Sequence, residues 1–169
     1  MIAVAGVDMA AWDALARAAG VPLCVLLGGS IDPVTSYNSN GLWLKSPNEV
    51  AGEAVELREE GGFQGLKLRL GRERLADDLA TIEAVREAVG TDMSLMVDFN
   101  QGLHFGEALE RCHAIDDLGL TWIEEPIVYD NLEGYARLTA DLKTPVQIGE
   151  NFYGPRALYT ALQMKAAIT

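Results

Sequence analysis

Three acidic residues recur at a constant interval and could share one metal ion. Asp98, Glu124 and Glu150 each follow an apolar run of β type, in steps of 26 residues. Three carboxylates brought together would repel one another unless a cation joined them. Oxygen-only ligands suit a hard divalent ion such as Mg²⁺, and zinc is disfavoured because no histidine or cysteine accompanies them. The alternative is that each acid is a separate strand-end residue paired with a base from another loop.

The direction of these side chains follows from the alternation of faces along a strand. We expect Glu124 to point inward, and Glu125 to point outward or toward the loop that begins at Pro126. On adjacent parallel strands, three acids at the same height would project into one small volume. The residues predicted to share the inward face are Met96 with Asp98 and Asn100, Trp122 with Glu124, and Val146 with Ile148 and Glu150.

Two cations lie one expected strand earlier, in the segment GLKLRLG. Lys67 and Arg69 are two residues apart and therefore share a face. Two long cations side by side on an inward face are costly unless an anion meets them, so a substrate carboxylate is a natural partner. The alternative is that this pair balances the acidic ligands. Such a balancing pair would not exclude a role in catalysis.

The segments that carry these residues alternate between strand and helix patterns. Five strands each lead into a helix, which requires right-handed crossovers and a parallel sheet. An open doubly wound sheet and a closed (β/α)8 barrel both satisfy this order, but acids at successive carboxyl ends of strands favour the barrel. We therefore predict an α/β fold, a partial (β/α)8 TIM barrel of about five βα units preceded by a helix. The expected strands are 33–38, 63–71, 93–101, 120–126 and 145–151, and the expected helices are 7–20, 46–62, 74–90, 105–119, 132–142 and 154–167.

The composition is that of a folded globular protein. The chain has 169 residues, of which 49% are apolar and 22% are charged. A formal net charge of −12 argues against nucleic acid or an anionic membrane as a partner. We find no apolar run that would span a membrane and no signal-peptide pattern, so we expect a cytoplasmic protein. Cys24 and Cys112 lack metal-type spacing and are predicted to be reduced, buried thiols.

Five motifs together resemble the mandelate racemase subgroup of the enolase superfamily. They are VDMAAWDAL, LKLRLG, MVDFNQ, TWIEEP and VQIGEN, and the resemblance covers essentially the whole chain. It implies that Asp98, Glu124 and Glu150 are Mg²⁺ ligands. It also places Asn100 in the same site and Lys67 against the substrate carboxylate. The implied reaction removes the proton next to that carboxylate, and the metal and an ammonium stabilise the resulting enediolate.

One position departs from the racemase pattern. The family places a lysine base two residues after the first lysine, where this chain has Arg69. A guanidinium stays protonated and is a poor base, so two-base racemisation is disfavoured. We expect single-base chemistry on a sugar acid or other 2-hydroxy acid, with acid-sugar dehydratase as the leading function and mandelate-type racemase as the alternative. In relatives, a His–Asp pair on later strands supplies the base.

The resemblance also implies that the chain is a fragment, because a complete barrel takes about 250 residues. Residues 1–30 would be the end of an N-terminal capping domain, and residues 31–169 an incomplete barrel domain with strands one to five. The complete protein is expected to be a homo-oligomer, and the fragment to have little or no turnover. His104 is predicted to be a loop or helix-start residue and His113 a structural one. The rival hypothesis is a non-catalytic half-barrel whose exposed strand edges pair with a second chain and whose acids bind an ion structurally.

Overall fold

The computed structural model describes residues 2–166 of the chain. It divides into two compact units, residues 1–35 and the part from Ser36 onward. None of the described helices combines the length and the apolar character needed to cross a bilayer. The first unit holds two helices, separated by a turn with Gly20 at φ 69°, and these are α1 (Ile2–Ala19) and α2 (Leu23–Leu26).

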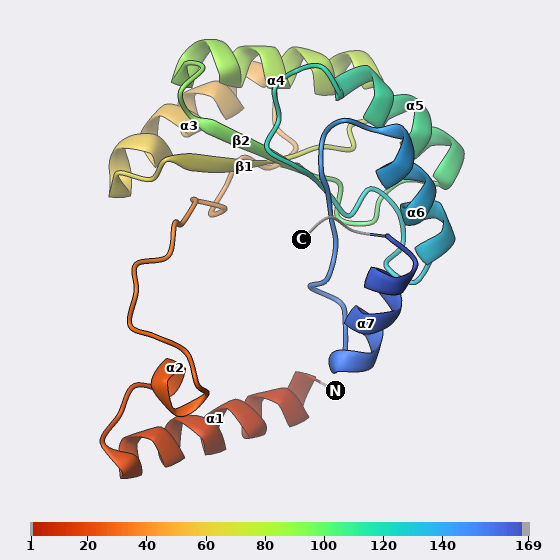
Figure 1. The fold of residues 1–169 in the computed structure, drawn as a ribbon. Helices are drawn as coiled ribbons and strands as arrows, with labels where there is room; N and C mark the ends of the chain where they lie inside the picture. Colours follow the sequence, from red (N-terminus) through yellow and green to blue (C-terminus); the bar gives the residue numbers. More distant parts are fainter. Residues whose placement is uncertain (1, 167–169) are drawn as a thin grey trace. The chain divides into compact units, whose positions relative to one another are not determined.

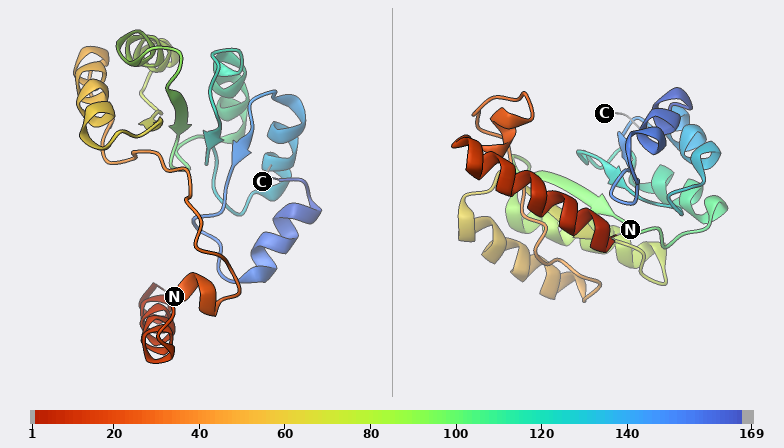
Figure 2. Two further views of the ribbon diagram at one scale, coloured as in Figure 1. Left: turned by 60° about the vertical axis from the view of Figure 1, so that its left-hand side comes forward. Right: turned by 90° about the horizontal axis from the view of Figure 1, so that it is seen from below.

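The second unit alternates helices and strands as predicted, and its helices cover one face of a parallel sheet (Figures 1 and 2). Four strands lie in the order β1-β2-β3-β4, so each strand pairs with the next one in the chain. The elements of this unit are α3 (Pro47–Gly61), β1 (Gly65–Arg69), α4 (Leu75–Val89), β2 (Ser94–Asp98), α5 (Phe105–Ile115), β3 (Ile123–Glu124), α6 (Leu132–Asp141), β4 (Val146–Gln147) and α7 (Pro155–Gln163).

The first expected strand, 33–38, is reduced to a single bridge between Asn38 and Leu66. The described part of the sheet therefore has four strands, and the prediction of five was wrong. The stretch from Asn38 to Leu42 still follows the edge of β1, because the carbonyls of these two residues accept backbone hydrogen bonds from that strand. Gly41 at φ 149° and Leu42 at φ 53° interrupt the extended conformation that a full strand would need.

Strands β3 and β4 are shorter than predicted, with two residues each. The chain leaves the sheet at Glu125, which has a φ of 38°, and near Gly149, which has a φ of 140°. Helix α7 is also shorter than the expected helix 154–167, and residue 167 lies outside the described residues. Asp98 and Glu124 are therefore the last residues of β2 and β3, whereas Glu125 and Glu150 lie in the turns that follow β3 and β4.

Helix α3 begins as its sequence predicts. Ser46 and Glu49 form the reciprocal capping box, and Pro47 occupies the first helical turn, where its missing N–H is not needed. The helix ends at Gly62, whose φ of 64° is a left-handed conformation that glycine adopts at little cost. Local sequence thus sets both ends of this helix.

The strands direct alternate residues toward the helices and away from them. Leu66 and Leu68 of β1 and Leu95 and Val97 of β2 are fully buried in the core between sheet and helices. Burial of each such side chain contributes about 1.5–3 kcal/mol relative to its exposure. The residues between them point to the opposite face, which is where the predicted site residue Lys67 lies.

Candidate metal centre

Asp98 and Glu124 lie at the ends of neighbouring strands and at the same height. They are register partners between β2 and β3, and only 1% and 7% of their surfaces are exposed. The alternation that buries Val97 and Ile123 in the core turns both acids to the other face. The prediction that these two acids share a height and a face is confirmed.

The ammonium of Lys67 lies between these two carboxylates. Its Nζ is 2.9 Å from Asp98 Oδ2 and 3.1 Å from Glu124 Oε1. Burial lowers the pKa of Lys67, but the hydrogen bonds and charges of the two acids outweigh that effect and raise the pKa above its ordinary value. Lys67 is therefore a buried cation, and its single ammonium group contacts both carboxylates.

Arg69 joins this cluster from the next inward position of β1. Its Nη1 contacts Asp98 Oδ2 and lies 3.3 Å from Asn100 Oδ1. Its guanidinium carbon lies 5.2 Å from the centre of the Trp43 ring, within the range of a cation–π contact. Its Nε is buried without a hydrogen-bond partner in the part of the chain that the structure describes. The predicted inward pairing of Lys67 and Arg69 is confirmed, and the anion that meets both is Asp98.

Asn100 and Trp122 orient the two carboxylates. The backbone N–H of Asn100 donates to Asp98 Oδ1 at 2.7 Å, and its Nδ2 lies 3.3 Å from Asp98 Oδ2. Trp122 Nε1 donates to Glu124 Oε2 at 3.1 Å, so these two residues share a face as predicted. Each acid is thus held by a residue two positions away in the chain.

The face predicted for the fourth strand was wrong. Val146 pairs with Ile123, and both belong to the core on the helix side, as does Ile148. The residue level with Glu124 is Gln147. The sequence pattern gave the period of the strand correctly but assigned its two faces the wrong way round.

Glu150 therefore does not lie at the height of the other two acids. It follows β4 by three residues, in an exposed turn that begins after Gly149. Within residues 2–166, no three acidic, histidine or cysteine side chains are grouped closely enough to hold a metal ion. Two of the predicted ligands are assembled, and the third lies on the next turn.

The donors that are in place suit a hard divalent cation. Asp98 and Glu124 present carboxylate oxygens to a common point, as their shared contact with Lys67 Nζ demonstrates. Oxygen-only donors of this kind match Mg²⁺, which is bound by a few carboxylates together with water or substrate oxygens. Asp98 and Glu124 therefore fit Mg²⁺ in donor type, and Glu150 is not grouped with them among residues 2–166.

Glu125 is more deeply placed than its predicted outward or loop-side position suggests. It is 1% exposed and accepts hydrogen bonds from the side-chain amides of Gln101 and Asn151. Burial raises the pKa of Glu125, and the negative charges of Glu150 and Asp98 add to that effect against the two amide hydrogen bonds. The sequence contained a signal for these hydrogen bonds, because an amide residue closely follows two of the acids. Gln101 lies three residues after Asp98, and Asn151 directly follows Glu150.

The histidines and cysteines form no metal-type group among the residues that the structure describes. His104 is the N-cap residue of α5, as expected for a helix-start residue, and His113 is exposed on that helix. Both cysteines are free. Burial raises the pKa of the Cys112 thiol to about 12. Cys24 is exposed, so the prediction that it is buried was wrong.

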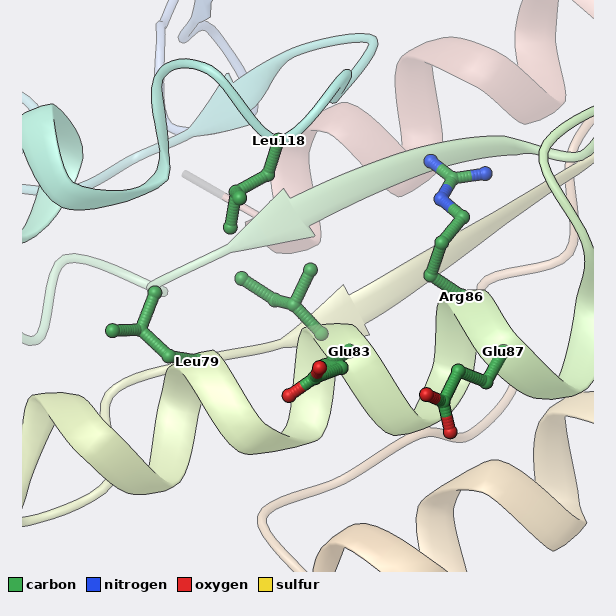
Figure 3. A pocket seen from close by; sticks show the side chains of 6 residues that line it. Leu79, Glu83, Arg86, Glu87 and Leu118 are labelled. Carbon is green, nitrogen blue, oxygen red and sulfur yellow. The ribbon is translucent and has the colours of Figure 1, made fainter.

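A groove beside α4 is lined by none of the predicted site residues (Figure 3). Its volume is about 460 Å³. The guanidinium of Arg86 at this groove already donates to the carbonyls of Gly90, Met93 and Gly119, so its polar capacity is used to hold loops together. The groove is lined by Leu79, Ile82, Glu83, Arg86, Glu87 and Leu118.

Two protein families have models that match this chain. The enolase C-terminal domain-like model matches residues 49–168, and the model for the mandelate racemase / muconate lactonizing enzyme N-terminal domain matches residues 1–28. L-talarate/galactarate dehydratase of Salmonella typhimurium is 39% identical over 148 residues, which are 88% of this chain and 37% of that protein. L-Ala-D/L-Glu epimerase of Bacillus subtilis is 35% identical over 170 residues, which are 99% of this chain and 45% of that protein.

A similar solved structure is that of an enolase from alpha proteobacterium BAL199 with bound Mg. It is 66% identical, has a TM-score of 0.94, and is matched over 99% of this chain and 47% of its own. The chain thus spans less than half the length of each of these three proteins. The predicted α/β fold, a partial (β/α)8 barrel, is confirmed.

Proposed function

Because this chain belongs to the mandelate racemase / muconate lactonizing enzyme family of the enolase superfamily, we propose that the complete protein removes the α-proton of a carboxylate substrate with the help of Mg²⁺. Asp98, Glu124 and Glu150 would hold the ion. The substrate would be a sugar acid or other 2-hydroxy acid, and the reaction a dehydration. Relatives that include a galactarate dehydratase and a solved structure with bound Mg support this assignment.

The observation that carries the proposal is the position of Lys67. Its ammonium lies 2.9 Å and 3.1 Å from carboxylate oxygens on two neighbouring strands. Those strand ends form the edge at which barrels of this kind build their sites. The same edge therefore offers both two carboxylates for a cation and a fixed positive charge for a substrate carboxylate.

The chain's own residues divide the work between binding and charge stabilisation. Bound Mg²⁺ would supply positive charge next to the substrate carboxylate, where negative charge grows as the proton leaves. Lys67 adds a second positive charge that is already desolvated and held in place by hydrogen bonds. Asn100 orients Asp98 and presents an exposed amide beside it. These groups bind the transition state more strongly than the singly charged substrate.

Arg69 favours dehydration over racemisation. Its guanidinium contacts Asp98 and cannot accept a proton at ordinary pH. The position where the family pattern places a second base therefore holds a fixed cation, and a reaction that needs one base suits this arrangement better than one that needs two. A mandelate-type racemase remains the alternative, supported by the epimerase among the relatives.

Proton exchange in D₂O tests the proposal on the full-length protein with Mg²⁺. Galactarate, related acid sugars and mandelate would be followed by ¹H NMR. A dehydratase converts the acid sugar to a 2-keto product, whereas a racemase inverts the substrate and introduces solvent deuterium at the α-carbon. EDTA-treated protein is the control and should be inactive in both cases. If no α-proton exchanges with any of these acids, both functions are refuted.

A further inference from the structure

Glu125 follows Glu124 directly but takes a different direction, because the backbone turns there with a φ of 38°. Its carboxylate is buried, and within residues 2–166 no lysine or arginine forms an ion pair with it. Two side-chain amides meet it instead. Gln101 Nε2 donates to Oε2 at 2.8 Å, and Asn151 Nδ2 lies 3.2 Å from Oε1 and 3.1 Å from Oε2. We call Gln101, Glu125 and Asn151 the amide clamp.

The amide clamp joins the turns that follow three successive strands. Gln101 belongs to the turn after β2 and lies three residues beyond Asp98. Asn151 belongs to the turn after β4 and directly follows Glu150. Glu125 itself begins the turn after β3. A displacement of the Glu125 carboxylate would therefore shift the turn that directly follows Asp98 and the turn that carries Glu150.

The backbone at the clamp is held in an unfavourable conformation. Asn100, Gln101 and Glu125 have φ values of 46°, 63° and 38°, and they are three of the five non-glycine residues with positive φ in the described part of the chain. Such a conformation costs about 1–2 kcal/mol per residue and persists only where surrounding contacts fix it. Here the backbone of Gln101 donates to Glu125 O at 2.7 Å, and its Oε1 accepts from Tyr129 N at 3.0 Å.

We propose that Glu125 is a positioning residue of the metal centre, whose carboxylate holds the turns after β2 and β4 so that Asp98 and Glu150 reach the same ion as Glu124. This inference rests on the proposed function, because it takes those three acids as the ligands. A carboxylate suits the role because both of its oxygens accept hydrogen bonds, as two facing amide donors require. Loss of a group that orients metal ligands typically weakens metal binding about 10–100-fold.

The decisive variant is Glu125→Gln in the full-length protein. Glutamine keeps the size of the side chain but turns an NH₂ group toward Gln101 or Asn151, so one hydrogen bond of the clamp is lost. We expect Mg²⁺ affinity, measured by isothermal titration calorimetry, to fall about 10–100-fold, and the EPR spectrum of bound Mn²⁺ to change. A folded variant whose affinity stays within about twofold of wild type overturns the proposal.

Two further variants separate the clamp from a general effect of charge. The double variant Gln101→Glu/Glu125→Gln exchanges donor and acceptor across the same contact and keeps the net charge, so it should regain most of the Mg²⁺ affinity. If it binds as weakly as Glu125→Gln, the clamp does not position the site and the proposal fails. Glu110→Gln makes the same charge change on the exposed face of α5, and it should bind Mg²⁺ like wild type. An equal loss in that variant would also count against the clamp.

Should Glu125→Gln fail to fold, Asn151→Ala carries the same test. This variant removes only the donor from the turn after β4, and we expect about a tenfold loss of Mg²⁺ affinity with the unfolding midpoint nearly unchanged. Unaltered affinity overturns the proposal. A wild-type protein that takes up no Mg²⁺ refutes the proposed function itself, whereas wild-type binding with unaffected variants refutes only the role of Glu125.

Discussion

Two buried clusters of carboxylates and cations lie in the second unit, and they differ in how completely the protein uses their polar groups. In the first cluster, Asp78 of α4 accepts hydrogen bonds from the backbone N–H groups of Gly71 and Arg72. It also pairs with Arg72 at 3.3 Å and with Arg111 at 2.8 Å. Both guanidiniums donate further to backbone carbonyls, those of Lys45 and Glu73 among them. This cluster ties the β1–α4 loop to helices α4 and α5.

In the second cluster, at the ends of β1, β2 and β3, the hydrogen-bonding groups are used less evenly. Asp98 Oδ2 is shared by Lys67, Arg69 and Asn100, while Arg69 Nε has no partner in the described part of the chain. A buried polar atom left without a partner is costly. Charge and burial are common to both clusters, and the unused hydrogen-bonding capacity of Arg69 Nε is what differs between them.

The largest expected effect comes from Glu124→Gln in the complete enzyme. Removal of one proposed metal ligand should lower kcat/KM by about 10³-fold or more, because metal stabilisation of the developing charge is worth several kcal/mol. The free energy of unfolding should change by no more than about 1 kcal/mol, because glutamine preserves the volume and Lys67 keeps its contact with Asp98. Steady-state kinetics and urea denaturation measure the two quantities. A large loss of stability with activity retained would place this cluster with the structural one.

Asp78→Asn should show the opposite behaviour. It leaves the Arg72 guanidinium without a carboxylate and leaves Arg111 with Glu107 alone, so the free energy of unfolding should fall by about 3 kcal/mol. The fraction that remains folded should bind Mg²⁺ as wild type does, because the variant does not touch the proposed ligands. Urea denaturation and calorimetry on the complete protein check this prediction. Weakened Mg²⁺ binding in the folded variant would erase the distinction between the clusters.

A smaller effect is expected from Trp43→Ala. The ring packs against Arg69, and loss of this cation–π contact should free the guanidinium and lower kcat/KM about fivefold, which corresponds to about 1 kcal/mol. Trp43→Phe keeps an aromatic face and should retain most of the activity. Kinetics of the two variants with one substrate give the comparison. Equal activity of the alanine variant and wild type would mean that Trp43 does not hold Arg69.

The smallest effect is expected from Asp117→Asn, which breaks the ion pair with Lys143. Both side chains are largely exposed, at 81% and 77%, so water and salt already screen their attraction. No measurable shift of the urea midpoint is expected. A clear shift would show that exposed pairs also stabilise this fold, and would weaken the use of burial to rank the clusters.

Much of the site could be predicted because it depends on local periodicity. The spacing of two residues between Lys67 and Arg69 placed both on one face, and the position of Asp98 and Glu124 at strand ends placed both at one height. The faces of β4 could not be predicted, because Val146 and Gln147 each suit a partly buried strand. Pairing with β3 decided that Val146 meets the core, and this contact involves a separate part of the chain.

The sequence by itself determined the alternation of strands and helices, the parallel order of the sheet and the acids that end its strands. These follow from patterns that span a few residues and from the handedness of the chain. Only the tertiary structure decided that Lys67 lies between Asp98 and Glu124, that Glu150 lies in a turn beyond β4, and that Glu125 is buried among amides. Such features depend on where each strand leaves the sheet, and hydrogen bonds from neighbouring strands and turns fix that point.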